Sequence, residues 1–309
     1  MTSPRRALKV AGIVGPTAAG KSAIALELAP RLGAEIVSID SMQVYLDMDV
    51  GTAKPTRAMR AEVPHHLLDL KPPGHDLTVA EFQSLARAAI DNISRRGLLP
   101  LLVGGSGLYF RAVVDELSFP PRSAEVRESL EAEVEALGTA VLHARLVRLD
   151  PAAAERIEPA NARRIVRALE VIELTGRPFS DNDAWDRYES VYDLCVAGLT
   201  LDRPLLFERI EGRVDRMLAA GLIEEARALS RRPLGRTARQ ALGYRQVLEA
   251  PEGAGVDEIR EEIVRATKRF ARRQESWFRA DPRISWFDAS DEEAAGAVMD
   301  HFRGALRLA

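Results

Sequence analysis

GPTAAGKS, residues 15–22, is the stretch that decides the fold of this chain. It fits the pattern G-x-x-x-x-G-K-[S/T], in which the backbone N–H groups of a glycine-rich loop surround phosphate oxygens. An apolar run at 10–14 precedes the loop, and apolar residues recur after it at helical spacing until Gly33. The motif requires this order of strand, loop and helix, and the helix N-terminus adds a dipole that favours an anion. The stretch therefore predicts a site that holds a di- or triphosphate.

The loop supplies three kinds of phosphate ligand. Its N–H groups can surround the anion, Lys21 can reach the terminal phosphate, and the Ser22 hydroxyl can bind Mg²⁺, which prefers oxygen ligands and usually bridges phosphates. Kinases, ATPases and GTPases share such a loop, so the loop alone does not identify the reaction. The predicted diphosphate-binding residues of the loop are Gly15, Pro16, Thr17, Ala18, Ala19, Gly20, Lys21 and Ser22.

Asp40 follows the next apolar run, 35–39, and begins the segment Asp40-Ser41-Met42-Gln43. In an open parallel sheet, ligands bind at the carboxyl ends of the strands, so Asp40 should lie at the same edge as the phosphate loop. A carboxylate there can accept a proton from a substrate that faces the phosphate. Two other roles remain open for Asp40, a turn or helix cap and a Mg²⁺ ligand.

The apolar run 98–103 ends in the segment Gly104-Gly105-Ser106-Gly107, at the same predicted edge. A P-loop ATPase commonly has an Asp that holds Mg²⁺ after such a strand. Glycines allow the backbone to approach a ligand closely, which is the role that we expect here. A plain tight turn is the alternative, but it leaves the missing Asp unexplained.

The composition is that of a soluble globular protein, with 309 residues of which 46% are apolar and 29% charged. No apolar run approaches the roughly 20 residues that span a bilayer, so no membrane association is expected. The basic segment 1–9 lacks the apolar stretch of a signal peptide. The single cysteine, Cys195, excludes internal disulfides and a Cys-cluster zinc site, and its apolar surroundings predict a buried thiol. We expect a cytoplasmic protein and, without direct support, a monomer.

The net charge of −3 does not by itself indicate a nucleic-acid-binding protein. Basic residues nevertheless gather in three groups, and three groups in an acidic protein favour a segregated basic surface over solvated helix faces. The groups are Arg163, Arg164 and Arg167; Arg231, Arg232, Arg236, Arg239 and Arg245; and Lys268, Arg269, Arg272, Arg273 and Arg279.

Alternating strand and helix patterns predict an α/β fold, a P-loop-type core whose parallel sheet is flanked by helices. Strands are expected at 10–14, 35–39, 98–103, 194–201 and 284–287. Helices are expected at 79–95, 204–219, 222–231, 239–249 and 257–280. The stretch 119–186 opens with two prolines and has Glu- and Arg-rich helical patterns but no convincing strand. It is predicted to be an all-helical insertion into a core formed by 1–118 and 187–309.

Further segments occur in a fixed order with the phosphate loop and Asp40-Ser41-Met42-Gln43-Val44-Tyr45. From about residue 10 to residue 287, this ordered set resembles the bacterial tRNA dimethylallyltransferase (tRNA isopentenyltransferase) family, and the set is far more specific than the loop alone. Ser22 and Ser106 stand where Thr is frequent in the family, and each retains a hydroxyl. The segments are Met48–Pro55, Pro64–Asp69, Gly104–Tyr109, Arg167–Val171, Gly243–Gln246 and Arg273–Arg279.

The resemblance implies an enzyme that transfers the dimethylallyl group of dimethylallyl diphosphate to N6 of adenosine 37 in tRNAs reading codons that begin with U, and releases diphosphate. It implies Mg²⁺, and an insertion that binds the anticodon stem-loop with a preference for adenines at positions 36 to 38. Arg213 becomes a further diphosphate ligand by its motif position, with an exposed helix arginine as the alternative. The implied tRNA contacts are Asp40, Ser41, Met42, Gln43, Ser106, Arg127, Arg163, Arg164, Arg167, Gln240, Gly243, Tyr244 and Arg245.

The residues suit that chemistry. Lys21, Ser22, the loop N–H groups and Mg²⁺ can stabilise charge on the departing diphosphate, and Asp40 can act as general base for the adenine amine. The base must be flipped into a pocket, where the Gln43 amide suits an adenine edge. Tyr109, Phe110 and Tyr244 could stack on it, although aromatic residues at strand ends more often belong to the core. A metal site at His65 and His66 is disfavoured, because no acidic or Cys ligand stands at zinc spacing.

Three other functions remain open. A small-molecule or nucleotide kinase would bind ATP in the same loop, but it predicts an acidic residue where Gly104 stands. An adenylate isopentenyltransferase would use free AMP and would not need surfaces for the anticodon stem-loop. A non-enzymatic RNA-binding NTPase would leave Asp40 without a role.

Overall fold

The computed structural model describes residues 7–181 and 187–308, which divide into two compact units. The first unit contains the described residues up to Glu116 and from Glu189 onward, and the second is Leu117–Tyr188. The expected start of the insertion, 119, lies inside the second unit. Its expected end, 186, falls outside the described residues.

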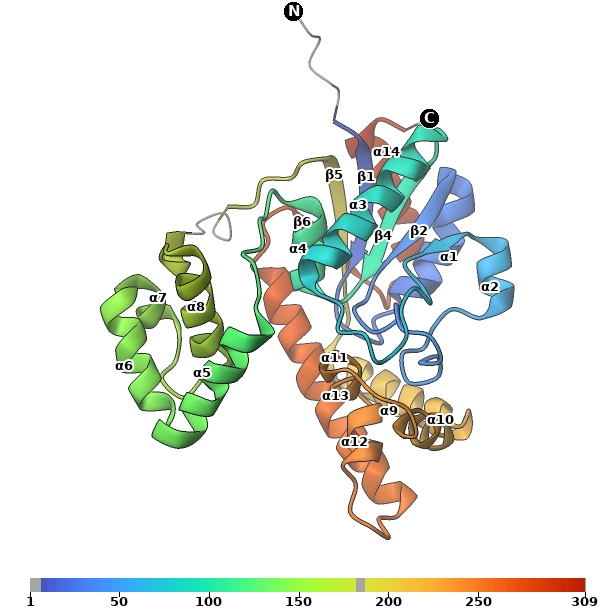
Figure 1. The fold of residues 1–309 in the computed structure, drawn as a ribbon. Coiled ribbons are helices and arrows are strands. Elements are labelled where there is room, and N and C mark those ends of the chain that lie inside the picture. Colours follow the sequence, from blue (N-terminus) through green and yellow to red (C-terminus); the bar gives the residue numbers. More distant parts are fainter. Residues whose placement is uncertain (1–6, 182–186, 309) are drawn as a thin grey trace, which may run out of the picture. The chain divides into compact units, whose positions relative to one another are not determined.

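A six-stranded parallel sheet in the order β3-β2-β4-β1-β5-β6 forms the centre of the first unit (Figure 1). The five predicted strands are confirmed within one or two residues at each end. The short edge strand β3 was missed, because two residues carry no periodic pattern. The strands are β1 (Lys9–Val14), β2 (Ala34–Ile39), β3 (His65–His66), β4 (Leu99–Gly104), β5 (Asp193–Thr200) and β6 (Ile284–Asp288).

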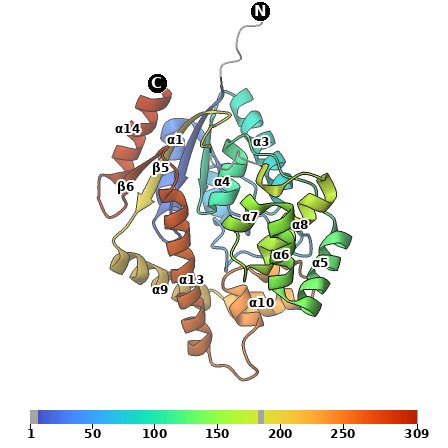
Figure 2. The ribbon, with the colours of Figure 1, turned by 90° about the vertical axis from the view of Figure 1, so that its left-hand side faces the viewer.

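Both faces of the sheet are buried, which explains why its strands are almost continuously apolar. Side chains alternate along β1, so Val10 and Val14 belong to one hydrophobic core while Ala11 and Ile13 belong to another. Helices α3 (Val79–Arg95) and α4 (Gly107–Val114) contribute to the first core, and α1 (Lys21–Leu32) and α14 (Ala294–Leu306) to the second. Figure 2 shows these two pairs of helices on opposite sides of the sheet.

The other helices of the first unit lie mainly beyond the carboxyl edge of the sheet, and they differ from expectation in one place. The continuous helix predicted at 239–249 is wrong, because the chain leaves helical geometry after Arg239 and resumes it at Tyr244. Gly243, the N-cap of α12, has φ 87°, a conformation that L side chains rarely adopt and that cannot continue a helix. These helices are α2 (Arg57–Glu62), α9 (Arg203–Ala219), α10 (Leu222–Ser230), α11 (Arg236–Arg239), α12 (Tyr244–Leu248) and α13 (Val256–Arg279).

The second unit has a hydrophobic core of its own, and every regular element among its described residues is helical, as predicted. Leu130, Leu146, Ile165 and Leu169 are at most 1% exposed and lie at the centre of this core. Its elements are α5 (Ala124–Leu137), α6 (Thr139–Leu149), α7 (Pro151–Arg156), α8 (Ala162–Thr175) and the short 3₁₀ turn η1 (Phe179–Asp181).

The residues at which the chain leaves the first unit lie beside the residues at which it returns to that unit. Asp115 forms an antiparallel bridge with Ser190, and the Val191 N–H donates to the Val114 carbonyl at 2.9 Å. The buried Asp115 carboxylate accepts hydrogen bonds from Arg111 and Arg283, each at 2.5 Å. A buried carboxylate is stable only when paired in this way, so this cluster fixes the backbone at the boundary. Across the described residues, no helix has both the length and the hydropathy to cross a membrane.

Gly107 begins α4 where there is no space for a side chain, since a Cβ there would lie 2.0 Å from Cε3 of Trp277. Gly107→Ala should therefore lower the free energy of unfolding by about 1–3 kcal/mol. Gly296→Ala is the matched control, because Gly296 lies within α14 with no atom within 4 Å of its Cβ position. It should be neutral or stabilise by about 0.5–1 kcal/mol. Urea denaturation measures both, and equal effects would contradict the packing argument.

Candidate active site

The phosphate loop lies at the carboxyl end of β1, between β1 and α1, as predicted. Gly15 has φ 139°, and a Cβ on it would lie 2.5 Å from the Leu199 carbonyl oxygen of β5. Gly20, at φ 95°, is the N-cap of α1, and Lys21 is the first helical residue. The two motif glycines are therefore required by the backbone itself, which turns sharply so that the helix begins at the anion site.

Only part of the loop is available to phosphate in this conformation. The Thr17 N–H donates to Oε1 of Gln274 at 2.9 Å, and the Ala19 N–H donates to the Pro16 carbonyl at 3.3 Å. The Lys21 ammonium also donates to that carbonyl, at 2.6 Å. Four other backbone N–H groups of the loop have no acceptor among the described residues. These free N–H groups belong to Ala18, Gly20, Lys21 and Ser22.

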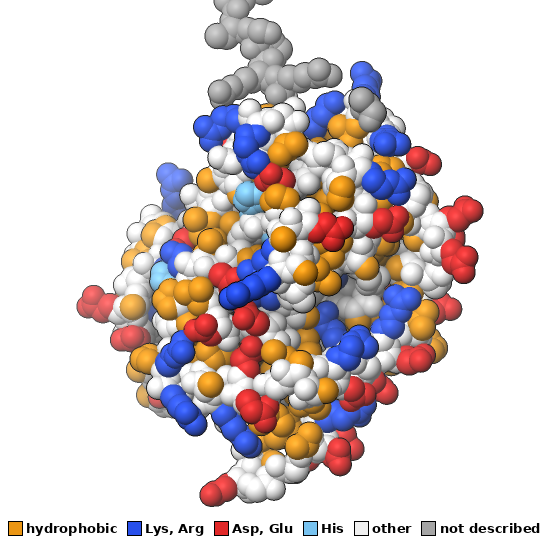
Figure 3. Space-filling model, turned by 90° about the vertical axis from the view of Figure 1, so that its right-hand side faces the viewer, with side chains coloured by type: hydrophobic (Ala, Val, Ile, Leu, Met, Phe, Trp, Pro, Cys, Tyr) orange, Lys and Arg blue, Asp and Glu red, His pale blue; other side chains and the backbone are white. Residues whose placement is uncertain are grey.

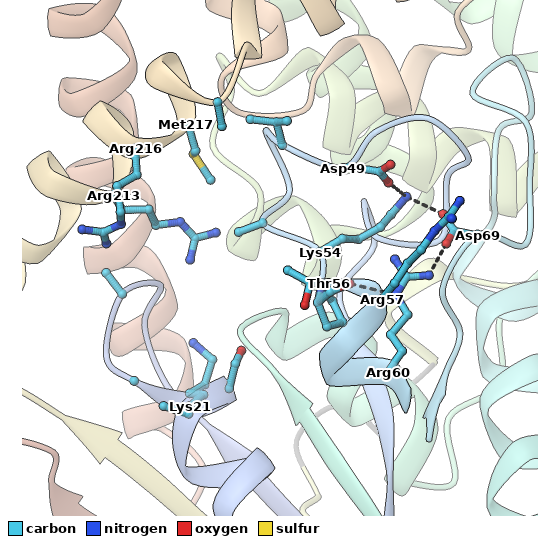
Figure 4. Close-up of a pocket in the computed structure, with 18 of the residues that line it drawn as sticks. Lys21, Asp49, Lys54, Thr56, Arg57, Arg60, Asp69, Arg213, Arg216 and Met217 are labelled. Atoms are coloured by element: carbon cyan, nitrogen blue, oxygen red, sulfur yellow. Dashed lines mark hydrogen bonds and ion pairs between the residues drawn. The ribbon is translucent and has the colours of Figure 1, made fainter. Parts of the chain in front are cut away.

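A cavity of about 870 Å³ opens beside the loop and is lined by three segments of the first unit and by Asp69. Figure 4 shows Lys21 beneath Arg213 and Arg216 of α9, with Lys54, Asp69 and Arg60 across the cavity from them. Figure 3 shows Lys and Arg side chains gathered beside a hollow on one face of the molecule. The apolar part of the lining includes Leu46, Val50, Ala53, Met217 and Ala220.

Three arginines of α9 form a cationic row along this cavity. Arg209, Arg213 and Arg216 are four and three residues apart, a spacing that places them on one helix face. Within the part of the chain that the structure describes, none of these guanidinium groups has an ion pair or hydrogen bond. The sequence prediction found only Arg213, although the spacing of the other two could have indicated them.

The charges in this row act on Lys21. Burial, and then the Arg213 guanidinium, lower the pKa of Lys21 from 10.5 to about 7, while Asp40 opposes the shift. Burial also lowers the pKa of Arg213, with Arg216 adding to the effect and Asp40 again opposing it. Lys21 and Arg213 are thus close enough to repel each other, and both lie within electrostatic range of the Asp40 carboxylate. An anion bound among them would relieve this repulsion.

Asp40 lies at the end of β2, on the same edge of the sheet as the loop. Its Oδ1 accepts a hydrogen bond from the Met42 N–H at 2.8 Å, which is the turn role left open by the sequence. The second carboxylate oxygen, Oδ2, has no hydrogen bond within the described residues. One oxygen therefore orients the side chain, and the other remains able to accept a proton.

The Gln43 amide is already used inside the protein. Its Oε1 accepts from the Ser38 hydroxyl at 2.8 Å, and its Nε2 donates to the Thr52 carbonyl at 3.2 Å. Ser41 and Met42 beside it are partly exposed. To recognise an adenine edge, Gln43 would have to exchange these bonds, whereas Ser41 would not.

The glycines at the end of β4 have a packing role that the sequence did not indicate. A Cβ on Gly104 would lie 2.1 Å from the Ile39 carbonyl oxygen, and one on Gly105 would lie 2.2 Å from Nε2 of Gln274. Close packing against protein atoms therefore accounts for these glycines, and approach to a ligand is not needed to explain them. Ser106, which follows these two glycines, is partly exposed, and its hydroxyl does not cap α4.

The three aromatic side chains that could stack on a flipped base are buried in this structure. Tyr109, Phe110 and Tyr244 are 9%, 0% and 1% exposed and belong to the core. The Tyr244 hydroxyl donates to Glu225 at 2.5 Å and accepts from the Gly51 N–H at 3.1 Å. The alternative that the Tyr244 side chain belongs to the core is confirmed, and the implied contact of this residue with tRNA stays a prediction.

Other predicted tRNA contacts of the first unit are accessible. Gln240 is exposed, and its Oε1 accepts from partly exposed Arg245 at 3.3 Å, while Arg245 also lies 3.7 Å from Glu249. Gly243, between them, is buried and can offer only its backbone. These residues lie around the break between α11 and α12.

The predicted arginines of the second unit fall into two classes. Arg127 and Arg167 both donate to Oε2 of Glu170, at 2.6 and 2.8 Å, and Glu170 is fully buried. Arg167 also donates to the carbonyls of residues 120 and 121. Arg163 and Arg164, in the first turn of α8, are exposed and have no ion pair with any described residue. The first two hold the unit together, whereas the other two are free to bind an anion.

Two acid–base clusters that the sequence prediction missed shape the far wall of the cavity. The Glu225 carboxylate accepts from the N–H groups of Asp49, Val50 and Gly51 at 3.0–3.2 Å. Buried Lys54 donates to Asp49 at 2.7 Å and to Asp69 at 2.6 Å. The Glu225 cluster has no sequence signal, because its partners lie 174–176 residues away in the chain. The partners of Lys54 lie only 5 and 15 residues away, in the segments Met48–Pro55 and Pro64–Asp69 of the ordered set. Strained backbone accompanies them, with positive φ at Asp47, Ala53, Leu67 and Asp69.

Mg²⁺ has one suitable protein ligand at the loop. The Ser22 side chain is exposed to the cavity, and its hydroxyl has no partner among the described residues. Mg²⁺ usually keeps several waters and takes one or two protein oxygens together with substrate phosphates, so a single hydroxyl fits this pattern. Within the described ranges, no group of three or more His, Cys, Asp and Glu residues could hold a metal ion.

The pKa of about 7 for Lys21 predicts a pH-dependent affinity for a diphosphate monoester. An anion binds the protonated ammonium better, so the affinity should fall as pH rises from 7 to 9, by up to about tenfold per pH unit. The ligand itself adds little, because phosphate monoesters ionise near pH 6. In Lys21→Arg the guanidinium stays charged, so the dependence should disappear. Calorimetry without tRNA measures both, and equal slopes would contradict this role for Lys21.

Sequence comparisons show the family to which the chain belongs. The model of a family described as IPP transferase matches residues 43–281, and that of a family described as isopentenyl transferase matches 8–68. The chain is 55% identical to a tRNA dimethylallyltransferase of Streptomyces coelicolor over 93% of this chain and 92% of that protein. It is likewise 55% identical to a tRNA dimethylallyltransferase of Acidothermus cellulolyticus, over 94% of this chain and 93% of that one.

Solved structures give the same result. The tRNA isopentenylpyrophosphate transferase of Bacillus halodurans superposes with a TM-score of 0.72 at 40% identity, over 97% of each chain. A eukaryotic dimethylallyltransferase acting on tRNA superposes with a TM-score of 0.80 at 25% identity, over 94% of this chain and 77% of that one. With a matching family model over most of its length and relatives above half identity, the chain belongs to the tRNA dimethylallyltransferase family.

Proposed function

We propose that this protein is a prenyltransferase that moves the dimethylallyl group of dimethylallyl diphosphate to N6 of adenosine 37 in tRNA. One observation carries the proposal most directly. Unpaired N–H groups, Lys21 and the three arginines of α9 converge on one cavity without an ion pair to any described residue. They do so at the sheet edge where Asp40 keeps a free oxygen. The family supplies the reaction for which such a site is suited, with relatives named for dimethylallyl transfer to tRNA.

In the reaction, the bond between C1 of the dimethylallyl group and the diphosphate oxygen breaks as the adenine N6 bonds to C1. Negative charge grows on the departing diphosphate, where the loop N–H groups, Lys21 and Arg213 can stabilise it. The amine must lose one proton, and Oδ2 of Asp40 can accept it while Oδ1 remains bonded to the Met42 N–H. Positioned donors of this kind stabilise a developing charge without reorganising during the reaction.

The Ser22 hydroxyl would hold Mg²⁺ at the loop. The bound ion supplies further neutralisation of the diphosphate charge. The α9 arginines then contribute permanent positive charge, and Lys21 adds to it when its ammonium is protonated.

The proposal assigns the second unit to the anticodon stem-loop and adenosine 37 to a position beside Asp40. Free arginines at the start of α8 suit RNA phosphates, which dominate affinity for nucleic acids. An adenine must leave its stack before its N6 can react, and the accessible hydroxyls of Ser41 and Ser106 can hydrogen-bond it there. We further propose a preference for adenines at positions 36 to 38, a monomeric protein and a cytoplasmic site of action.

The proposed function is tested by incubating the purified protein and Mg²⁺ with labelled dimethylallyl diphosphate and an unmodified tRNA transcript. Digestion and mass analysis of the nucleosides should show N6-isopentenyladenosine in the tRNA. Parallel incubations replace the tRNA with AMP, or the prenyl donor with ATP. Product on AMP alone would indicate an adenylate isopentenyltransferase, and phosphoryl transfer from ATP without prenylation would indicate a kinase or NTPase.

Asp40→Asn should slow transfer by about 10²–10⁴-fold, because an amide cannot accept the proton of the amine. Binding of dimethylallyl diphosphate should stay within a few-fold of wild type, since Asp40 is not a phosphate ligand in this proposal. Asp300→Asn, an exposed substitution on α14, is the control for loss of one negative charge. Single-turnover rates and calorimetry separate the two effects. Normal transfer by Asp40→Asn would mean that another group removes the proton.

Arg164→Ala should weaken binding of an anticodon stem-loop RNA and flatten its salt dependence. Loss of one phosphate contact should reduce the slope of log affinity against log salt by about 0.7–0.9. Arg303→Ala, at an exposed position on α14, removes the same charge elsewhere and should leave the slope unchanged. Fluorescence anisotropy between low and moderate salt measures both slopes. A wild-type slope for Arg164→Ala would remove Arg164 from the RNA-binding surface.

A further inference from the structure

Gln274 of α13 connects two loops that come from different strands. Its Oε1 accepts from the Thr17 N–H of the phosphate loop at 2.9 Å, and its Nε2 donates to the Gly105 carbonyl of the loop after β4 at 2.8 Å. The side chain is 7% exposed, so both bonds are shielded from water. Thr17 and Gly105 are 257 and 169 residues away from Gln274 in the chain.

The two loops also approach each other directly at this place. A Cβ on Gly105 would lie 2.2 Å from Nε2 of Gln274 and 3.2 Å from the Gly15 carbonyl oxygen. One turn further along α13, Trp277 occupies the space where a side chain on Gly107 would stand, 2.0 Å from its Cβ position. One face of α13 therefore packs against the Gly104–Gly107 loop on both sides of Ser106 and holds the phosphate loop through Gln274.

We propose that Gln274 is a positioning residue, whose two-ended amide sets the spacing between the diphosphate-binding loop and the loop that carries Ser106. This inference rests on the proposed function. In that function the phosphate loop would hold the departing diphosphate, while the partly exposed Ser106 hydroxyl would hydrogen-bond the adenine. Small misplacements of such groups cost much of the rate, so the bridge acts on the transfer step through the two loops.

Only a primary amide satisfies both loops at neutral pH. Thr17 needs an acceptor and Gly105 needs a donor, and the amide offers one of each at its two ends. Met has a similar length but offers neither a strong donor nor a strong acceptor. Glu offers acceptors when ionised, but when protonated it has both a donor and an acceptor. Burial beside a carbonyl favours the protonated form, so Glu can replace the amide at low pH.

The test compares wild type, Gln274→Met and Gln274→Glu in single-turnover transfer from saturating dimethylallyl diphosphate to tRNA. We expect Gln274→Met to be slower by about 10- to 100-fold, with tRNA affinity within twofold of wild type. Gln274→Glu should be similarly slow at pH 8, and its rate relative to wild type should recover at least severalfold as pH falls to 6. Thr267→Val is the matched control, because this buried hydroxyl of α13 donates only within its own helix, to Ile263.

Three results would overturn the inference. These are a wild-type rate for folded Gln274→Met, a loss of the same size in Thr267→Val, or a deficit in Gln274→Glu that does not change with pH. If Gln274→Met does not fold, the pH profile of Gln274→Glu decides alone. Failure of the proposed function would be recognised separately, because wild type itself would then form no prenylated nucleoside.

Discussion

Positive charge that forms no ion pair within the described residues is the constraint on which this structure depends. Lys21 and the arginines of α9 share one cavity with free N–H groups, and burial and mutual repulsion depress the pKa of Lys21. Such an arrangement lowers the stability of the empty protein and favours a ligand of several negative charges. The rest of the first unit can be understood as the means of holding these charges in place, since they would otherwise move apart.

Buried polar bridges provide that rigidity at the carboxyl edge of the sheet. Gln274 joins the phosphate loop to the loop after β4, Glu225 collects three consecutive N–H groups of the cavity wall, and Lys54 joins two aspartates. Each bridge is satisfied at every end, which makes it stabilising where a half-satisfied group would be costly. The strained residues of the same wall are tolerated because these bridges over-determine the backbone.

Several residues that resemble recognition elements in sequence have a role in the fold. Arg127 and Arg167 neutralise the buried Glu170, Tyr244 lies inside the core, and the glycines after β4 make room for protein atoms. Buried charges and hydroxyls must have partners, so a residue placed inside a unit is recruited for that purpose whatever its chemical capacity. The groups left for RNA are those at the surface, Arg163 and Arg164 among them.

The sequence by itself determined the parallel sheet, the phosphate loop and the position of Asp40 at its edge, because apolar runs and glycine spacing are local signals. It also indicated the helical character of the second unit. Only the tertiary structure decided which N–H groups remain free, why Gly104, Gly105 and Gly107 are glycines, and that Gln274, Glu225 and Arg216 belong to the site. Those facts depend on contacts between residues far apart in the chain, and the periodicity of a single segment carries no information about its partner. The break between α11 and α12 was missed for the same reason. An apolar pattern that permits a helix does not reveal the backbone angle that packing imposes on Gly243.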